Sequence, residues 1–350
     1  MSWRNKLPSA YDRRADARSR NETERICCVL NPRAAAGRAG QRVGELERAL
    51  DRTFAQWEIR KTEGPGHASE LAAQALADGF HIVASVGGDG TANEVVNGFF
   101  DGQRPRTRAG IFALVPWGTG SDLQKSLKSP GNLGDALWVA STGMTLPTDV
   151  GHVAFEASQG RGERVFINVA GFGANGDVVH RANSASKKMG GRLTFLQATL
   201  GSLVHYEPPR VQVRWKSPDG DSGWEGQLLS AFVANGRYCG GGMDVGGGGS
   251  MHDGCFDLTV LPTKGRARNI AESWRLYDGT VWKVAGARRV YATQLTATSL
   301  DGREVLLDID GEQPGALEAT FTALPRQLQV RGGWLRSPLL TPRHETWRPS

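Results

Sequence analysis

The sequence of 350 residues lacks the long apolar runs and the paired cysteines that mark several classes of protein. No apolar stretch reaches the roughly 18 residues that span a bilayer, and no apolar segment of a secretory signal follows the basic residues of Met1–Arg20. The four cysteines include no C-x-x-C pair and are too few for a disulfide framework. We therefore expect a soluble protein of a reducing compartment, the cytoplasm.

Glycine, in contrast, is abundant, with 46 residues. No repeating G-x-y pattern accompanies it, which excludes a collagen-like chain. The remaining roles for so much glycine are tight turns and backbone that approaches a ligand closely.

The net charge of +6 lies at the two ends of the chain. Residues 1–25 and 331–350 each carry a net charge of +3, so residues 26–330 are neutral overall. This distribution does not indicate a basic face across the whole protein, and we expect no nucleic-acid partner. We interpret residues 1–24 as a basic tail.

Between Arg25 and Thr145 short apolar runs alternate with amphipathic stretches. The apolar runs are 26–30, 57–62, 81–86 and 111–115, and the helical stretches are 38–50, 67–79, 91–100, 121–127 and 134–141. This alternation predicts β-α units around a parallel, Rossmann-like sheet, an α/β domain over 25–145. From 146 to 330 alternating and β-branched runs predict a β-rich sandwich, with one helical stretch at 193–206.

The segment HIVASVGGDGTANEVVNG carries the strongest site signal. A buried strand ends at Val86, glycines follow, and Thr91 with Glu94 forms a capping box that predicts a helix start at Thr91. A glycine loop that leads into a helix N-terminus favours phosphate. Because the carboxylate of Asp89 would repel phosphates unless a cation lies between them, the sequence also implies Mg²⁺.

Two further loops follow strands at the same edge of the predicted sheet. They are NPRAAAG at 31–37 and PWGTGSD at 116–122. Ligands of parallel sheets bind at the carboxyl edge, so the loops can face one triphosphate. The segment GFGANG at 171–176 matches a dinucleotide fingerprint, but no acid occurs from Val178 to Tyr206, and we reject that interpretation.

Taken together, these motifs resemble the diacylglycerol kinase catalytic family of bacterial lipid kinases, whose relatives include sphingosine and ceramide kinases. Six motifs occur in the family's order: Asn31-Pro32; Gly87–Gly98; Pro116–Asp122; Asn168–Asp177; Gly240–Met243 with Asp253-Gly254; and Asp310-Gly311-Glu312 with Pro325–Val330. The resemblance implies an ATP-binding α/β domain, a β-rich lipid-substrate domain, and residues 331–345 packing back onto the first domain. It also implies ATP-dependent phosphorylation of a lipid hydroxyl, with diacylglycerol as the first candidate and a ceramide or sphingoid base as alternatives.

The resemblance assigns roles to individual residues. Asp310 would be the general base and Glu312 would orient it, while Asp89 and Asp122 would hold the catalytic Mg²⁺ through waters. The ATP contacts would be Asn31, Pro32, Arg33, Ala34, Ala35, Thr62, Gly87, Gly88, Asp89, Gly90, Thr91, Ala92, Asn93, Gly118 and Thr119. A second, structural Mg²⁺ would use backbone carbonyls of Ser250 and Cys255 and the side chain of Asp253.

Three departures from the family pattern keep other functions open. Ala34 and Ala35 replace a Ser-Gly pair, Ser121 replaces an Asn, and Gly246–Gly249 predicts a mobile loop beside the structural metal site. The alternatives are a kinase of a soluble acceptor such as NAD⁺ and a nucleotide-binding regulator without catalysis. The basic segment 181–192 suggests a lip facing an anionic membrane, with peripheral attachment at the inner face; a homodimer stays open.

Overall fold

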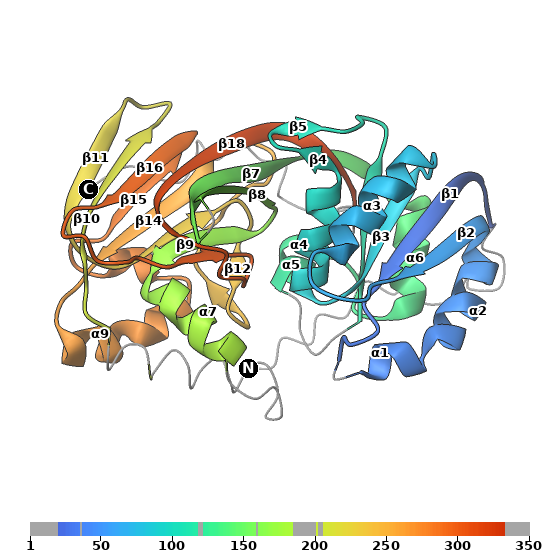
Figure 1. Cartoon of the computed structure of the whole chain (residues 1–350), viewed down its shortest axis with the longest axis horizontal. Coiled ribbons are helices and arrows are strands. Elements are labelled where there is room, and N and C mark those ends of the chain that lie inside the picture. Colours follow the sequence, from blue (N-terminus) through green and yellow to red (C-terminus); the bar gives the residue numbers. More distant parts are fainter. Residues whose placement is uncertain are drawn as a thin grey trace.

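The computed structural model describes residues 20–35, 37–117, 122–158, 160–184, 201 and 206–332. Predictions for Gly118, Thr119 and residues 333–345, and most of the expected helix at 193–206, lie outside these residues. Figure 1 shows two halves side by side along the long axis, one with helices flanking strands and one dominated by strands.

The first half is built on four parallel strands in the order β2-β1-β3-β6. These strands are β1 (Asn21–Leu30), β2 (Phe54–Lys61), β3 (Ile82–Gly87) and β6 (Ile111–Pro116). The helices are α1 (Arg38–Gln41), α2 (Val43–Thr53), α3 (His67–Ala77), α4 (Asp89–Gly98), α5 (Asp122–Ser126) and α6 (Leu133–Thr142), and a small hairpin joins β4 (Phe100–Asp101) to β5 (Arg104–Pro105).

Both faces of this sheet are covered, which explains its near-continuous apolar strands. Cys27 and Val29 of β1 pack with α3 and α4 on one face. Ile26, Cys28 and Leu30 pack with α2 and α6 on the other.

The second half is mostly antiparallel. Its strands are β7 (Thr145–Ala157), β8 (Gly160–Phe166), β9 (Val169–Gly173), β10 (Arg210–Lys216), β11 (Ser222–Ala234), β12 (Tyr238–Cys239), β13 (Met243–Asp244), β14 (Phe256–Pro262), β15 (Arg288–Ala292), β16 (Gln294–Ser299), β17 (Leu307–Ile309) and β18 (Ala316–Arg331). The helical elements are α7 (Ala174–Ser184), α9 (Arg266–Glu272), η3 (Ser273–Leu276) and η4 (Val281–Lys283). Strand β11 pairs with β10, β14 and β9, and β9 pairs in turn with β17. The prediction of a parallel α/β half followed by a β-rich half is confirmed.

Strand β18 links the two halves into one sheet (Figure 1). Its first part pairs with β16 and β7, and its last three residues, Gln329–Arg331, pair in parallel with β6. At this junction the guanidinium of Arg331 holds both carboxylate oxygens of Glu24, at 2.6 and 2.9 Å. Glu24 lies in β1, so the first strand begins at Asn21 and the boundary predicted after residue 24 falls inside it.

Within the described residues, none of the helices is long and apolar enough to cross a membrane.

Candidate active site

A cleft of about 610 Å³ lies between the two halves and is strongly acidic. The loops after β3 and β6 form one wall, and β8, β9 and the turn after β17 form another. The charged residues that line it are Asp89, Asp122, Asp308, Asp310, Glu312 and Arg164.

Two of the predicted phosphate loops contribute to this cleft, one through Asp89 and Gly90 and the other through Asp122. The Nδ2 of Asn31 donates to the hydroxyl of Thr91 at 3.1 Å and joins the first loop to helix α4. Beside it, the amide of Thr62 donates to the carbonyl of Leu30 at 2.9 Å. Gly87 has to be glycine here, because a Cβ would overlap the side chain of Thr91.

Helix α4 begins at Asp89, two residues earlier than predicted, with Gly88 as its N-cap. The expected capping box is therefore wrong. Its Thr91 hydroxyl binds Asn31, and its Glu94 Oε2 accepts the amide of Ala68 in helix α3 at 3.1 Å. The early start brings the N-terminus of the helix, a place that favours anions, to the GGDG segment.

The two aspartates predicted to hold Mg²⁺ are engaged in hydrogen bonds. Asp89 accepts the amides of Asp122 and Leu123 at 3.0 and 3.2 Å, which fixes the start of α5 against α4. Asp122 is itself buried, and it accepts Lys125 Nζ at 2.7 Å and the amide of Gly241 at 2.6 Å.

Asp310 sits in a cradle of four donors. Its Oδ1 accepts the amides of Asn168 and Val169, and its Oδ2 accepts the amide of Ile167 and the Nδ2 of Asn93, all at 2.9–3.0 Å. Its backbone takes a positive φ of 50°, in the tight turn that aims the carboxyl group at β9. Burial raises the pKa of Asp310 to about 6, although the four donors work against this rise.

Asn93 and Arg164 connect Asp310 to Glu312. The Oδ1 of Asn93 accepts Arg164 Nε at 2.8 Å, and Arg164 Nη2 lies 2.8 Å from Glu312 Oε2. Arg164 is a cleft cation that sequence reasoning missed, since it looks like any charged residue at the end of a strand. Asn93, predicted to contact the nucleotide, is fully buried and holds this network together.

Asp308 was also missed. It precedes Asp310 by two positions, and both side chains line the cleft, Asp308 from strand β17 and Asp310 from the turn that follows it. The amide of Gly311 donates to its Oδ1 at 2.9 Å, and burial raises its pKa to about 7, with the nearby Asp310 adding to the rise.

The first loop carries the departures noted in the sequence. Ala35 adopts a φ of 53°, the left-handed conformation that glycine takes without steric cost. Arg33 is exposed and donates its amide to Asn31 Oδ1 at 2.9 Å, while Pro32 and Ala34 are half-buried. Ala92 is fully buried below the loop.

The residues predicted for a structural Mg²⁺ lie in the turn before β14. Cys255 donates its amide to Asp253 Oδ1 at 3.2 Å, and Ser250 is buried. Nearby, the buried Asp149 accepts the amides of Gly254 and Arg326, at 2.7 and 2.8 Å. Throughout the described chain, no three His, Cys, Asp or Glu side chains converge closely enough to hold a metal.

The glycines expected to form a mobile loop have packing partners. A Cβ on Gly246 would overlap the carbonyl of Gly236, and one on Gly247 would overlap the guanidinium of Arg289. Arg289 is in turn fixed by the buried Asp257, at 2.5 and 2.8 Å. Gly247 thus lets the backbone lie directly on this ion pair, whereas a Cβ on Gly248 would meet nothing within 4 Å.

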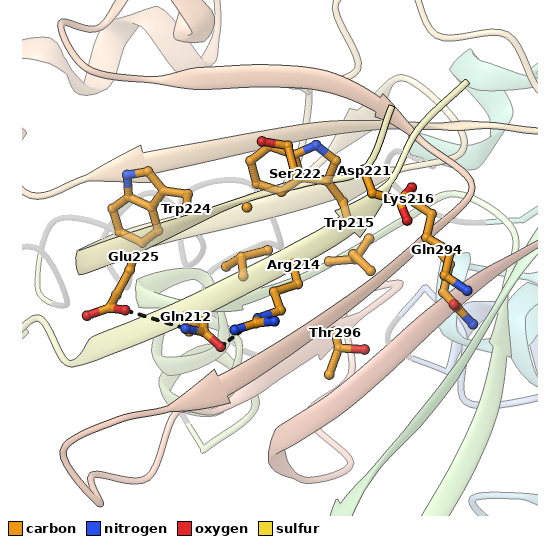
Figure 2. A pocket seen from close by; sticks show the side chains of 13 residues that line it. Gln212, Arg214, Trp215, Lys216, Asp221, Ser222, Trp224, Glu225, Gln294 and Thr296 are labelled. Carbon is orange, nitrogen blue, oxygen red and sulfur yellow. Dashed lines mark hydrogen bonds between the residues drawn. The ribbon is translucent and has the colours of Figure 1, made fainter. Parts of the chain in front are cut away.

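A second hollow, also about 610 Å³, lies on strands β10, β11 and β16 and contains none of the predicted site residues. Figure 2 shows Gln212 hydrogen-bonded to both Arg214 and Glu225 there. The acidic cleft, which gathers residues of five of the six sequence motifs, is the better candidate active site.

Comparison with known proteins bears on the family that the motifs predicted. Residues 25–153 match the diacylglycerol kinase catalytic domain, and residues 168–332 match the YegS C-terminal NAD kinase beta sandwich-like domain. A probable lipid kinase YegS-like of Xanthomonas oryzae is 31% identical over 207 residues, 59% of this chain and 64% of that protein. The chain thus aligns with less than two thirds of the length of this relative.

Two further comparisons extend over most of the chain. The diacylglycerol kinase of Bacillus subtilis is 25% identical over 88% of this chain and 96% of its own. A crystal structure of a putative diacylglycerol kinase from Bacillus anthracis superimposes with a TM-score of 0.67 at 21% identity, covering 88% of this chain and 97% of that one. The fold is therefore that of the diacylglycerol kinases.

These matches define a protein with a diacylglycerol kinase catalytic domain followed by a YegS-type β domain. The two matched domains and the names of these relatives agree with the resemblance to the diacylglycerol kinase catalytic family that the motifs predicted.

Proposed function

We propose that the protein is an ATP-dependent kinase that phosphorylates a hydroxyl group of a membrane lipid while attached to the inner face of the membrane. Diacylglycerol is the first candidate acceptor, and a ceramide or sphingoid base is the alternative. The observation that carries the proposal is that the acidic cleft shares its walls with an apolar cavity.

The apolar cavity has a volume of about 60 Å³ and lies beneath helices α7 and α9. On α7, Val178 lines the cavity and the next residue, Val179, lines the cleft. In the β12–β13 hairpin, Cys239 lines the cleft and Met243 the cavity. A substrate with a polar head and an apolar body fits this pair of neighbouring hollows, with part of a hydrocarbon chain in the narrow cavity and the rest extending outward.

One polar atom at the cavity supports an amphiphilic ligand. Asn175 is buried and lines the cavity, and its Oδ1 has no hydrogen-bond partner within the described residues. A buried acceptor without a donor costs free energy, which a lipid hydroxyl or amide would recover on binding.

Phosphoryl transfer needs positioned phosphates, balanced charge and an acceptor for one proton. The lipid hydroxyl oxygen would attack the γ-phosphorus of ATP, the bond from that phosphorus to the ADP oxygen would break, and the hydroxyl proton would pass to a carboxylate. We assign the proton to Asp310, which burial makes more basic and four donors hold in place. Arg164, itself held by Glu312, fixes Asn93 and through it the orientation of this carboxyl group.

The donor set of the cleft also fits Mg²⁺ in kind, since five carboxylates line it beside a single arginine. Asp89 and Asp122 would hold the ion through water molecules, and phosphate oxygens of ATP would be further ligands, because Mg²⁺ keeps several waters and is often bound together with substrate phosphates. Bound there, the ion would neutralise charge on the phosphates.

The test is phosphate transfer from labelled ATP to a panel of lipids in detergent micelles, with identification of the product by mass. Asp310→Asn should lower the rate on the order of 10²-fold or more, the scale of general-base contributions. Transfer to NAD⁺ but to none of the lipids would favour a soluble acceptor. ATP binding without phosphate transfer to any acceptor would favour a nucleotide-binding regulator without catalysis.

A further inference from the structure

Two tryptophans are exposed in the short elements that cover the β-rich half. Trp274 in η3 is 54% exposed and Trp282 in η4 is 36% exposed. Across the described residues, the only other exposed large hydrophobic side chains are those of Met144 and Leu300. The two tryptophans lie within nine positions of the chain.

The same elements have an inner face that differs from the outer one. Ser273, Leu276, Val281 and Val284 line the apolar cavity. The tryptophans alternate with these residues along the chain and point outward. The outer surface of this segment therefore lies directly over the place where we put the hydrocarbon part of the substrate.

Cations surround the two tryptophans. Between residues 264 and 288 the chain has six basic and two acidic side chains, a net charge of +4: Lys264, Arg266, Arg268, Arg275, Lys283 and Arg288 against Glu272 and Asp278. Glu272 is already paired with Arg268 at 3.0 Å. The guanidinium of Arg275 lies 4.8 Å from the ring centre of Trp274, and Lys283 Nζ lies 5.2 Å from that of Trp282.

We propose that residues 264–288, which we call the docking surface, bind an anionic lipid bilayer. Tryptophan rings favour the depth of lipid headgroups, and cations beside them meet anionic phosphates. The proposal rests on the lipid kinase function, because docking here would bring the apolar cavity to the membrane. It places the contact on α9, η3 and η4 rather than on the segment 181–192, whose residues from 185 on lie outside the described chain.

The experiment is co-sedimentation of the full chain with vesicles of phosphatidylcholine alone, or mixed with phosphatidylglycerol. One variant removes three exposed cations of the docking surface, K264Q/R266Q/K283Q, and a second removes its rings, W274A/W282A. The matched controls are R48Q/R52Q/R108Q and M144A/L300A, which remove equal numbers of exposed side chains elsewhere. Two of the control arginines lie in α2, at the opposite end of the molecule (Figure 1).

We expect the wild type to bind the anionic vesicles preferentially. Each cation near an anionic membrane contributes about 1 kcal/mol, roughly a fivefold change in partitioning, so the triple variant should bind on the order of 10²-fold less tightly. Added salt should weaken the binding of the wild type to anionic vesicles, because it screens the cations. The binding of W274A/W282A, which keeps these cations, should depend on salt almost as strongly. That ring variant should lose several-fold in affinity at every salt concentration, while both controls should bind like the wild type.

The proposal is overturned if the wild type does not sediment with anionic vesicles, if both docking-surface variants bind normally, or if the controls lose as much affinity. Transfer to lipid in neutral detergent micelles is measured on the same proteins. Normal micelle activity without vesicle binding would refute the docking surface alone, and loss of micelle activity in the wild type would refute the kinase function itself.

Discussion

Replacing Asp308 by Asn should make the folded protein more stable at neutral and alkaline pH. Asp308 is 6% exposed, and burial raises its pKa from 3.8 to about 7. The folded state therefore holds a proton that the unfolded chain releases above its own pKa, and stability falls as the pH rises between these two values. Each pH unit of this window is worth about 1.4 kcal/mol, so the ionised carboxyl group costs at most about 4 kcal/mol above pH 7.

The asparagine keeps the oxygen that accepts the amide of Gly311 at 2.9 Å and removes only the charge. Asp310, two residues away, shares the site, so the pair titrates together and part of the pH dependence will remain. We expect a gain of about 2–4 kcal/mol at pH 8 and a gain near zero at pH 4.

The assay is urea unfolding of the wild type and Asp308→Asn at a series of pH values between 4 and 8, with lipid phosphorylation measured in parallel. If Asp310 alone accepts the proton, Asp308→Asn keeps most of its turnover while Asp310→Asn does not. If the free energies of unfolding of the wild type and Asp308→Asn differed equally at pH 4 and pH 8, the elevated pKa of the buried Asp308 would be refuted. A loss of turnover limited to Asp308→Asn would move the base to that residue.

Four further substitutions test the packing of the fold. Arg331→Met should cost about 2–4 kcal/mol in urea unfolding, because it leaves Glu24 without the guanidinium that lowers its pKa against the opposing effect of burial. Gly98→Ala should cost about 1–3 kcal/mol, because its Cβ would overlap the carbonyl of helix α3, whereas Gly44→Ala, which meets only the flexible end of a side chain at 3.5 Å, should stabilise α2 by up to about 1 kcal/mol. Ala35→Gly should raise the melting temperature or the affinity for ATP, because it relieves the strain of a φ of 53°, worth about 1 kcal/mol. An unchanged melting temperature together with an unchanged ATP affinity would contradict this.

The sequence predicts the elements that depend on neighbours along the chain. The alternation of buried runs and amphipathic stretches placed β1, β3 and β6 and the helices between them, and the glycine loops fell at strand ends because both features follow local periodicity. The prediction of a capping box was wrong because it depends on a contact between residues far apart in the sequence. Glu94 satisfies the amide of Ala68 in another helix, a contact that local spacing cannot show.

Features that depend on distant residues were not predictable in the same way. The early start of β1 at Asn21 is linked to a pair between Glu24 and Arg331, 307 positions apart. Arg164 belongs to no motif, and its role is evident only from the folded structure, where it donates to Asn93. The first aspartate of the DID segment, Asp308, offered a signal that could have been used, because it lies only two positions before the proposed base and lines the same cleft.

Helix α4 is the element through which the phosphate loops and the proposed base are held at a fixed separation. It begins at Asp89 in the phosphate loop, and four residues apart on one face it presents Asn93 and Asn97. Asn97 exchanges hydrogen bonds of 2.9 Å with the amide and carbonyl of Val165, as a neighbouring strand would. Asn93 binds the same carbonyl and Asp310. Since both asparagines lie on one helix, any movement of the phosphate loop relative to Asp310 must break these bonds or carry β8 with it. The N-E-x-x-N motif therefore sets the geometry of the cleft.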